Sequence, residues 1–247
     1  MATIHLVSGV VGMAAVPFLP LPYVESWPYI FASVLLHLGY QLFLVKAYVY
    51  GDLGQVYPIA RGISPLLLGF ITVFWIGEEL TLQMMLAIVL ISLGIFSLMF
   101  PGKMSIKYRF RPIIYALATG SFIAAYTLAD GVGVRASGNA ASYVLWLMAL
   151  ECLPLLGITL ILRKRTVFSS IHKNWKYAVP GGFLSLSAYW IVIWAMQHAP
   201  IALVSAIRES SVVIVALMSI WVLKEETTVK HLLSAVMVAV GVILTQL

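Results

Sequence analysis

The sequence predicts an all-α polytopic membrane protein with nine transmembrane helices that form two inverted repeats. Two observations support this prediction. Of the 247 residues, 62% are apolar and only 10% are charged, whereas about 25% are charged in an ordinary soluble domain. The chain also matches itself at a fixed offset of 147–148 residues. The composition nearly excludes a soluble enzyme, and the chain is too hydrophobic to be disordered.

The apolar residues fall in nine continuous runs, each about as long as the ~20 residues that a helix needs to cross ~30 Å of hydrocarbon. Backbone groups in lipid must bond internally, so each run is expected to be a helix. The first run follows no basic segment and ends at Pro20-Leu21-Pro22, so we expect a retained helix and not a signal peptide. The runs cover residues 4–22, 28–49, 55–76, 82–100, 113–131, 141–162, 175–197, 200–223 and 229–247.

Most breaks between runs are short and favour tight antiparallel hairpins, but the connections at 101–112 and 163–176 are longer and strongly basic. When nine crossings alternate, 12 of the 15 Lys and Arg residues fall on one side and only Arg135 falls on the other; Arg61 and Arg208 lie within runs. The positive-inside rule places the basic side in the cytoplasm. Residue 1 is then expected to be cytoplasmic and residue 247 external. The net charge of +6 therefore indicates orientation, and we expect no nucleic-acid partner.

The internal repeat relates helices one to four to helices six to nine. The matches pair Trp27 with Trp175, residues 55–59 with 203–207, Glu78-Glu79 with Glu225-Glu226, Gly94 with Gly241 and, at an offset of 137, Pro17 with Pro154. The fifth run has no partner in the first half. Each repeat is thus a five-helix unit, and the odd number places the two copies in opposite orientations. Inverted repeats are a recurring design of secondary transporters, in which rocking of one half against the other opens a central site to alternate sides.

Residues 51–65 read GDLGQVYPIARGISP. This stretch resembles the hallmark of EamA-type permeases of the drug/metabolite transporter superfamily. Gly77-Glu78-Glu79-Leu80, Lys224-Glu225-Glu226 and the late glycine of each unit also fit this pattern. The resemblance covers essentially the whole chain. It implies two EamA repeats, of which the first is expected to lack its opening helix.

The predicted organisation is a first repeat at residues 1–100, a basic connecting loop at 101–112 and a second repeat at 113–247.

Arg61, which follows Tyr57-Pro58 in the third run, is a candidate substrate ligand. An ionisable group near the bilayer centre is costly and usually faces a cavity or a partner. Pro58 and Pro65 are expected to make the helix irregular around Arg61. Its guanidinium can bind a carboxylate or phosphate through two hydrogen bonds. The alternative is an arginine that extends to the interface or joins two helices.

The repeat places Glu209 opposite Arg61, and residues related by a pseudo-two-fold axis often meet near it. We therefore predict an Arg61–Glu209 ion pair at the centre. Arg208 and Ser205 belong to the same polar stretch, which is expected to line the pathway. The alternative is a polar clamp between helices.

Glu151, in the middle of the sixth run, is the candidate for proton coupling. An isolated carboxyl group in lipid can bind and release a proton near neutral pH, because burial disfavours its charged form. The alternative is a neutral, hydrogen-bonded glutamic acid. Asp130 lies near a helix end and is expected at the interface.

Polar and aromatic side chains in the second and seventh runs are further candidates for the pathway: His37, Tyr40, Gln41, Trp190 and Trp194. Aromatic surfaces with a few polar groups are typical of small-molecule sites. A lone buried histidine is also a common structural residue, and membrane tryptophans often mark the interface.

These features predict a secondary transporter that moves a small metabolite, an amino-acid-like compound or a drug by alternating access, with efflux driven by a proton or substrate gradient. Nothing in the sequence indicates a cofactor or a metal site, and the motif of a nucleotide-binding loop is absent. The alternative is a truncated or non-transporting membrane subunit. An intramembrane enzyme is disfavoured, since no His-Glu-x-x-His occurs. We expect a multi-pass protein of the bacterial inner membrane, and the Ala235–Ala239 spacing permits a homodimer contact.

Overall fold

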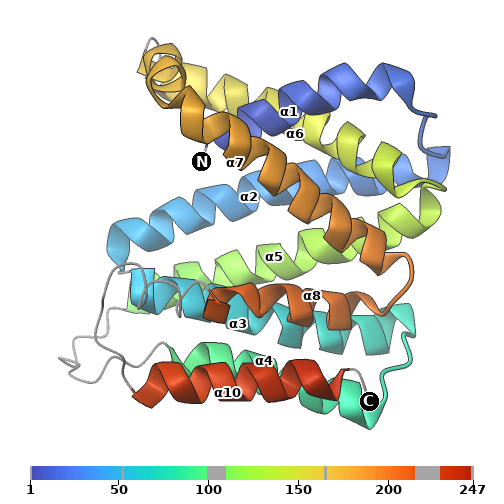
Figure 1. Ribbon diagram of the computed structural model, residues 1–247, viewed down its shortest axis with the longest axis vertical. Coiled ribbons are helices and arrows are strands. Elements are labelled where there is room, and N and C mark those ends of the chain that lie inside the picture. The colour runs from blue at the N-terminus through green and yellow to red at the C-terminus, as the bar shows by residue number, and fades with distance from the viewer. Residues whose placement is uncertain (1, 52, 99–109, 164–165, 215–228, 246–247) are drawn as a thin grey trace. The chain divides into compact units, whose positions relative to one another are not determined.

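The computed structural model describes residues 2–51, 53–98, 110–163, 166–214 and 229–245, and it is helical with no strand over these residues (Figure 1). Each of the nine predicted runs contains a helix, which confirms the all-α prediction. The helices are α1 (Ala2–Ala15), α2 (Trp27–Tyr50), α3 (Leu53–Ile71), α4 (Leu82–Ser97), α5 (Phe110–Ala136), α6 (Ala140–Arg163), α7 (Thr166–Met196), α8 (Ile201–Glu209) and α10 (Val229–Leu244).

Several of these helices are long and apolar enough to cross a membrane. Five helical segments within the described ranges meet this requirement: Val24–Tyr50, Val56–Ile76, Phe110–Ala136, Ala140–Ile158 and Trp175–Met196. Three shorter apolar helices accompany them, at His5–Phe18, Leu82–Ser97 and Leu233–Leu244. The chain is therefore an integral, multi-pass membrane protein.

The structure corrects the prediction of a long connection at residues 163–176. Helix α6 continues to Arg163 and α7 begins at Thr166, so most of this basic stretch is helical. A hydropathy pattern marks only the apolar part of a helix, whereas polar residues such as lysine continue it readily into water. The other basic connection, 101–112, lies largely outside the described residues, and α5 begins at Phe110.

The chain forms two compact units. Unit 1 comprises Met1–Leu38 and Ala129–His198, and unit 2 comprises Gly39–Leu128 and Ala199–Leu247. The division falls within α2 and within α5, so each unit contains helices from both predicted repeats. The compact units are thus not the sequence repeats, whose boundaries at 1–100 and 113–247 stay a prediction.

In unit 2, α4 packs along α10, and α3 packs against α4 and α8 (Figure 1). Two glycines permit the close approach of α4 and α10. A Cβ atom added to Gly94 would lie 2.7 Å from Val238 Cγ2, and one added to Gly241 would lie 2.7 Å from Ile91 Cγ1. Residue numbers rise along one helix as they fall along the other, so the two helices are antiparallel.

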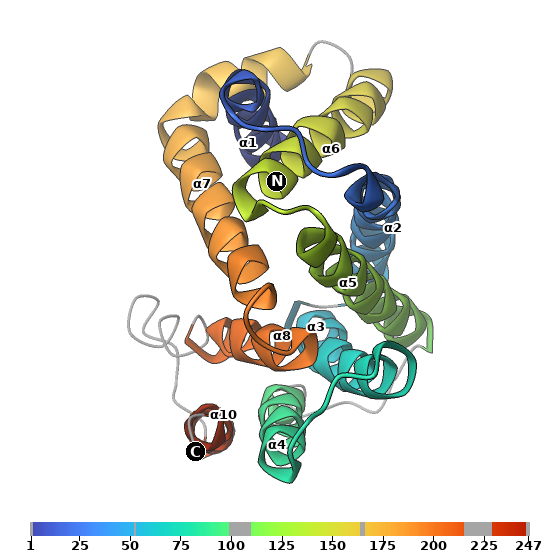
Figure 2. The ribbon, with the colours of Figure 1, turned by 90° about the vertical axis from the view of Figure 1, so that its right-hand side faces the viewer.

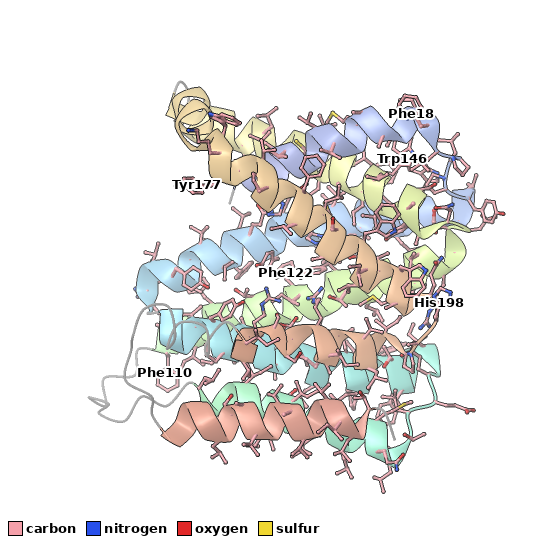
Figure 3. The ribbon with its side chains drawn as sticks, viewed as in Figure 1. Phe18, Phe110, Phe122, Trp146, Tyr177 and His198 are labelled. Carbon is pink, nitrogen blue, oxygen red and sulfur yellow. The ribbon has the colours of Figure 1, made fainter. Side chains whose placement is uncertain are left out.

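Aromatic and polar contacts complete the packing in unit 2. Phe122 of α5, labelled in Figure 3, stacks on Phe43 of α2, with ring centroids 5.1 Å apart. The Ser234 hydroxyl of α10 donates a hydrogen bond to the carbonyl oxygen of Gly94 at 2.6 Å. This bond satisfies a buried hydroxyl group at the point where the two helices come closest.

In unit 1, α1 packs against both α6 and α7 (Figure 2). A Cβ atom added to Gly9 would lie 2.2 Å from Cys152 Cβ, and one added to Gly12 would lie 2.8 Å from the Leu145 carbonyl oxygen. Helices α1 and α6 are therefore antiparallel. The Ser8 hydroxyl of α1 donates a hydrogen bond to the carbonyl oxygen of Gly182 in α7 at 3.0 Å.

Helices related by the sequence repeat thus pack against one another. The pairs are α1 with α6, α3 with α8, and α4 with α10. The antiparallel α1–α6 and α4–α10 pairs have the relation that an inverted repeat predicts, because a two-fold axis in the membrane plane reverses the direction of each helix.

Connections predicted on the same membrane face also meet within each unit. In unit 1, the Tyr23 N–H group donates to the Ser137 carbonyl at 3.2 Å, and Gln197 Nε2 donates to the Val134 carbonyl at 3.0 Å. In unit 2, the Ile201 N–H group donates to the Glu78 carboxylate. These contacts bring together connections that the alternation of crossings predicts on one face, and the alternation itself stays a prediction.

Candidate substrate site

Helix α3 carries Arg61 and continues from Leu53 to Ile71 through both Pro58 and Pro65. The expected irregularity around Arg61 is therefore wrong. Each proline removes one N–H donor, but the neighbouring turns keep the helical path. The departure from α-helical geometry comes later, in a π-helical turn at Thr72–Ile76 that ends at Gly77 with φ of 74°.

Arg61 meets Glu209, as the repeat predicts. Arg61 Nη1 donates to both carboxylate oxygens of Glu209, at 3.0 Å to Oε1 and 2.9 Å to Oε2. The Glu209 side chain is fully buried, while that of Arg61 is 24% exposed. The predicted ion pair is confirmed, and its part in a substrate pathway stays a prediction.

Arg208 is the second cation of this cluster. Its Nε and Nη2 atoms donate to Glu209 Oε1 at 3.1 and 3.0 Å, and Nη2 also lies 3.4 Å from the Tyr126 hydroxyl. We refer to Arg61, Arg208 and Glu209 as the charge triad. Although Arg208 and Glu209 are adjacent on α8, both side chains belong to this one cluster.

The charge triad has a net charge of +1, because two guanidinium groups share one carboxylate. Glu209 is the only carboxylate in contact with either arginine within the described part of unit 2. In that same part, the Nε and Nη2 atoms of Arg61 have no hydrogen-bond partner. Charged groups removed from water are costly unless they are paired, so this arrangement favours an additional anionic group beside the arginines.

The α8 helix tightens at the triad, where Ser210 keeps right-handed helical backbone angles (φ −58°, ψ −24°). It ends at Glu209, Ser210 forms a turn, and helix resumes at 211–214. The Ser210 N–H group bonds to the Ile207 carbonyl at 3.1 Å, as expected for a tightened last turn. Arg208 also lies in the last turn, where a cation is favoured by the helix dipole.

Tyrosine rings surround the triad. The Arg61 guanidinium lies 5.4 Å from the centroid of the Tyr57 ring, and that of Arg208 lies 6.0 Å from the centroid of the Tyr126 ring. Tyr40 packs edge-on against Tyr126 with centroids 5.8 Å apart. Such contacts stabilise a guanidinium away from water.

Ser205 adds a further polar group on α8. It lies one helical turn before Glu209 and is completely buried. Its hydroxyl has no hydrogen-bond partner among the residues that the structure describes. Buried hydroxyl groups normally have partners, so Ser205 is an available donor or acceptor in the same region of unit 2.

The structure describes the remaining predicted pathway residues within their own units. His37 and Gln41 lie one turn apart on α2, but His37 belongs to unit 1 and Gln41 to unit 2. Trp190 and Trp194 of α7 are 41% and 54% exposed. The structure thus places both tryptophans on the surface of unit 1, and Trp194 packs against the ring of His198 (labelled in Figure 3).

Glu151 is not the isolated carboxyl group that the sequence suggested. Its side chain is 3% exposed, and Oε1 lies 3.6 Å from Nδ1 of His5 in α1. Hydropathy along α6 could not reveal this neighbour, because His5 lies almost 150 residues away in the chain. The proton-coupling role stays a prediction.

Asp130 is buried among its neighbours, with only 1% of its surface exposed. Its carboxylate accepts hydrogen bonds from the hydroxyl groups of Tyr143 in α6 and Tyr189 in α7. Helix α5 continues to Ala136, Asp130 faces its neighbours in unit 1, and its expected place at the membrane interface stays a prediction. Tyr126 was missed, as one tyrosine in an apolar run carries no distinguishing signal.

Metal binding finds no support in the described part of the chain, where no three His, Cys, Asp or Glu side chains form a group that could hold an ion.

Comparisons with known proteins agree with this architecture. A solved structure titled "Crystal structure of protein" superimposes with a TM-score of 0.78, covering 100% of this chain and 87% of its own, at 18% sequence identity. At that identity the likeness shows the fold alone. No curated protein matches the sequence.

The model of the EamA-like transporter family matches residues 110–247, more than half of the chain. The chain therefore belongs to the EamA-like transporter family, a group within the drug/metabolite transporter superfamily.

Proposed function

We propose that this protein is a secondary transporter that moves a small organic solute across the membrane by alternating access. The observation that carries the proposal is the charge triad at the C-terminal end of α8. A buried carboxylate between two arginines, with guanidinium donors still available, suits a solute that bears a carboxylate or another anionic group. Amino-acid-like compounds fit this description.

The tyrosines beside the triad support an organic solute. Tyr40, Tyr57 and Tyr126 provide aromatic surface and hydroxyl groups next to the arginines. Small-molecule sites usually combine apolar and aromatic walls with a few polar groups that orient the ligand. The anionic end of the solute would then bind the arginines, and its organic part would contact the rings.

Alternating access rests on the antiparallel packing of repeat-related helices. In transporters built from inverted repeats, movement of one helix set against the other exposes a fixed site to each side in turn. We further propose efflux from the cytoplasm driven by a proton or substrate gradient, and location in a bacterial inner membrane. A homodimer through the Ala235–Ala239 face of α10 is part of the same proposal.

Transport can be measured in proteoliposomes by counterflow of labelled amino acids, organic acids and organic cations. We expect the protein to exchange at least one anionic or zwitterionic solute faster than protein-free liposomes. Arg61→Ala and Glu209→Ala should each abolish this exchange, because each disrupts the charge triad. Glu79→Ala is the matched control, since Glu79 is an exposed carboxylate of the same unit.

Arg61→Lys separates charge from geometry, because lysine keeps the positive charge but cannot form the planar pair of hydrogen bonds. We expect partial exchange in this variant. If no solute in the panel exchanges, the transport proposal is wrong. If exchange survives in both alanine variants, the protein transports but the triad is not its substrate site.

A further inference from the structure

A second group of buried polar side chains lies in unit 1, apart from the charge triad of unit 2. Asp130 of α5 and Glu151 of α6 are 1% and 2% exposed. His5 of α1 lies beside Glu151, and the ring of His37 in α2 packs against Tyr189, which donates a hydrogen bond to Asp130. These four residues form what we call the titratable chain. Chains of buried Asp, Glu and His side chains within membrane segments mark proton relays in pumps and transporters.

The contacts of Asp130 come from neutral groups. Oδ1 accepts from the Tyr143 hydroxyl at 3.1 Å, and Oδ2 accepts from the Tyr189 hydroxyl. The titratable groups that face Asp130 are therefore His37 from α2, Tyr143 from α6 and Tyr189 from α7. Because both oxygens have donors and almost no surface is exposed, an ion larger than a proton has no access without displacing a tyrosine.

His37 is held in place by Ser33, one turn earlier on α2. Its Nδ1 atom lies 2.9 Å from the Ser33 carbonyl oxygen and 3.2 Å from the Ser33 hydroxyl. A carbonyl oxygen can only accept, so Nδ1 carries the hydrogen of this bond. The ring also packs edge-on against Tyr189, with centroids 6.0 Å apart. His37 and Asp130 thus share Tyr189 as a neighbour.

We infer that the titratable chain is the site where a transported proton binds, with Asp130 as its principal acceptor and His37 as its immediate partner. This inference rests on the proposed function, because it names the coupling ion of the transport cycle. The sequence indicated Glu151 alone as the candidate for proton coupling. Here Asp130 is the principal proton acceptor, and Glu151 with His5 extends the group toward α1.

Proton uptake at Asp130 would change how three helices are joined. A carboxylate accepts two hydrogen bonds here, whereas a carboxylic acid has one O–H group that must donate. On protonation, the hydroxyl group of Tyr143 or Tyr189 must therefore change from donor to acceptor. These tyrosines lie on α6 and α7, so protonation alters the hydrogen bonds that connect α5 to both helices. Proton binding at Asp130 is thereby coupled to the positions of α6 and α7 relative to α5.

The test is the infrared absorption of protonated carboxyl groups, measured on the full chain in lipid as the pH is changed between about 5 and 8. The wild type should show a carboxylic-acid band that appears and disappears with pH, and Asp130→Asn should remove its main component. Tyr189→Phe keeps the carboxyl group but removes one donor, so the band should remain and change in frequency. Glu79→Gln is the control that leaves it unchanged. An unaltered band in Asp130→Asn would overturn the inference, as would a wild type without a titrating band.

A second measurement separates this inference from the proposed function. Counterflow exchange needs no net proton movement, whereas accumulation driven by a pH gradient does. With any solute of the panel that the wild type exchanges, Asp130→Asn should retain counterflow and lose accumulation. A titrating Asp130 band without counterflow would refute the transport proposal and leave the proton site standing. Unchanged accumulation in Asp130→Asn would refute the proton site and leave transport standing.

Discussion

Glu209 is the residue on which the charge balance of unit 2 depends. It is fully buried and is the shared acceptor of Arg61 and Arg208. Desolvation makes a buried ion pair a weak source of net stability, but removal of one partner leaves the other charge uncompensated. The effect of a substitution should therefore depend on the balance of charges more than on the number of hydrogen bonds lost.

We predict that Glu209→Met lowers the free energy of unfolding by about 3–5 kcal/mol, because two guanidinium groups then lack a counter-charge. In the double variant Arg61→Met/Glu209→Met the net charge of the cluster returns to +1, and much of the loss should be recovered. Denaturant titration in detergent measures both, as a double-mutant cycle. Purely additive losses in the double variant would show that the two side chains are not coupled.

At the scale of elements, the close contact of α4 with α10 requires a glycine on each helix. Gly94 and Gly241 occupy equivalent repeat positions, and each faces the partner helix at a distance that excludes a side chain. Small residues allow helices to approach closely in lipid, where packing contributes most to association. The two glycines that the sequence repeat relates thus make equivalent contacts, because each packs against the helix that carries the other.

We predict that Gly94→Leu and Gly241→Leu each destabilise the protein by about 1–3 kcal/mol, because the added side chain overlaps Val238 or Ile91. Gly157→Leu in α6 is the matched control, since a Cβ atom there has no neighbour within 4 Å. Thermal unfolding in detergent compares the three variants. Equal stabilities of all three would contradict the close contact between α4 and α10.

The start of α8 depends on a carboxylate from outside the helix. Glu78 accepts the N–H group of Ile201 at 3.1 Å through Oε1 and 3.0 Å through Oε2. An acidic group at this end satisfies a free donor and is favoured by the helix dipole. We expect Glu78→Ala to cost about 0.5–2 kcal/mol in unfolding free energy, measured by the same denaturant titration. Glu79→Ala should cost much less, and a similar cost for both would contradict the capping role.

At the scale of the whole molecule, orientation in the membrane is set by the basic residues. The connections with Lys and Arg are predicted in the cytoplasm, and Glu79 is predicted on the outside. Cys152 is only 3% exposed and should not react with a maleimide in the membrane. The wild type therefore offers a low background for labelling.

We predict that Glu79→Cys reacts with a membrane-impermeant maleimide added to intact cells, whereas Lys46→Cys reacts only after the membrane is opened. Both positions are exposed in the structure, so a difference in labelling reports the side of the membrane. The reverse pattern would show that the chain is inserted with the opposite orientation.

The sequence by itself determined the nine apolar helices, their inverted relation and the Arg61–Glu209 pair. These follow from properties that are local or periodic: a helix needs a long apolar run in lipid, and a repeat brings equivalent positions together. Only the tertiary structure decided that Asp130 is buried between tyrosines, that Glu151 has His5 beside it, and that Tyr126 joins the charge triad. It also decided that the compact units take helices from both repeats. Which way a side chain faces, and which distant residue it meets, depends on helix rotation and packing, and hydropathy along a chain does not contain that information.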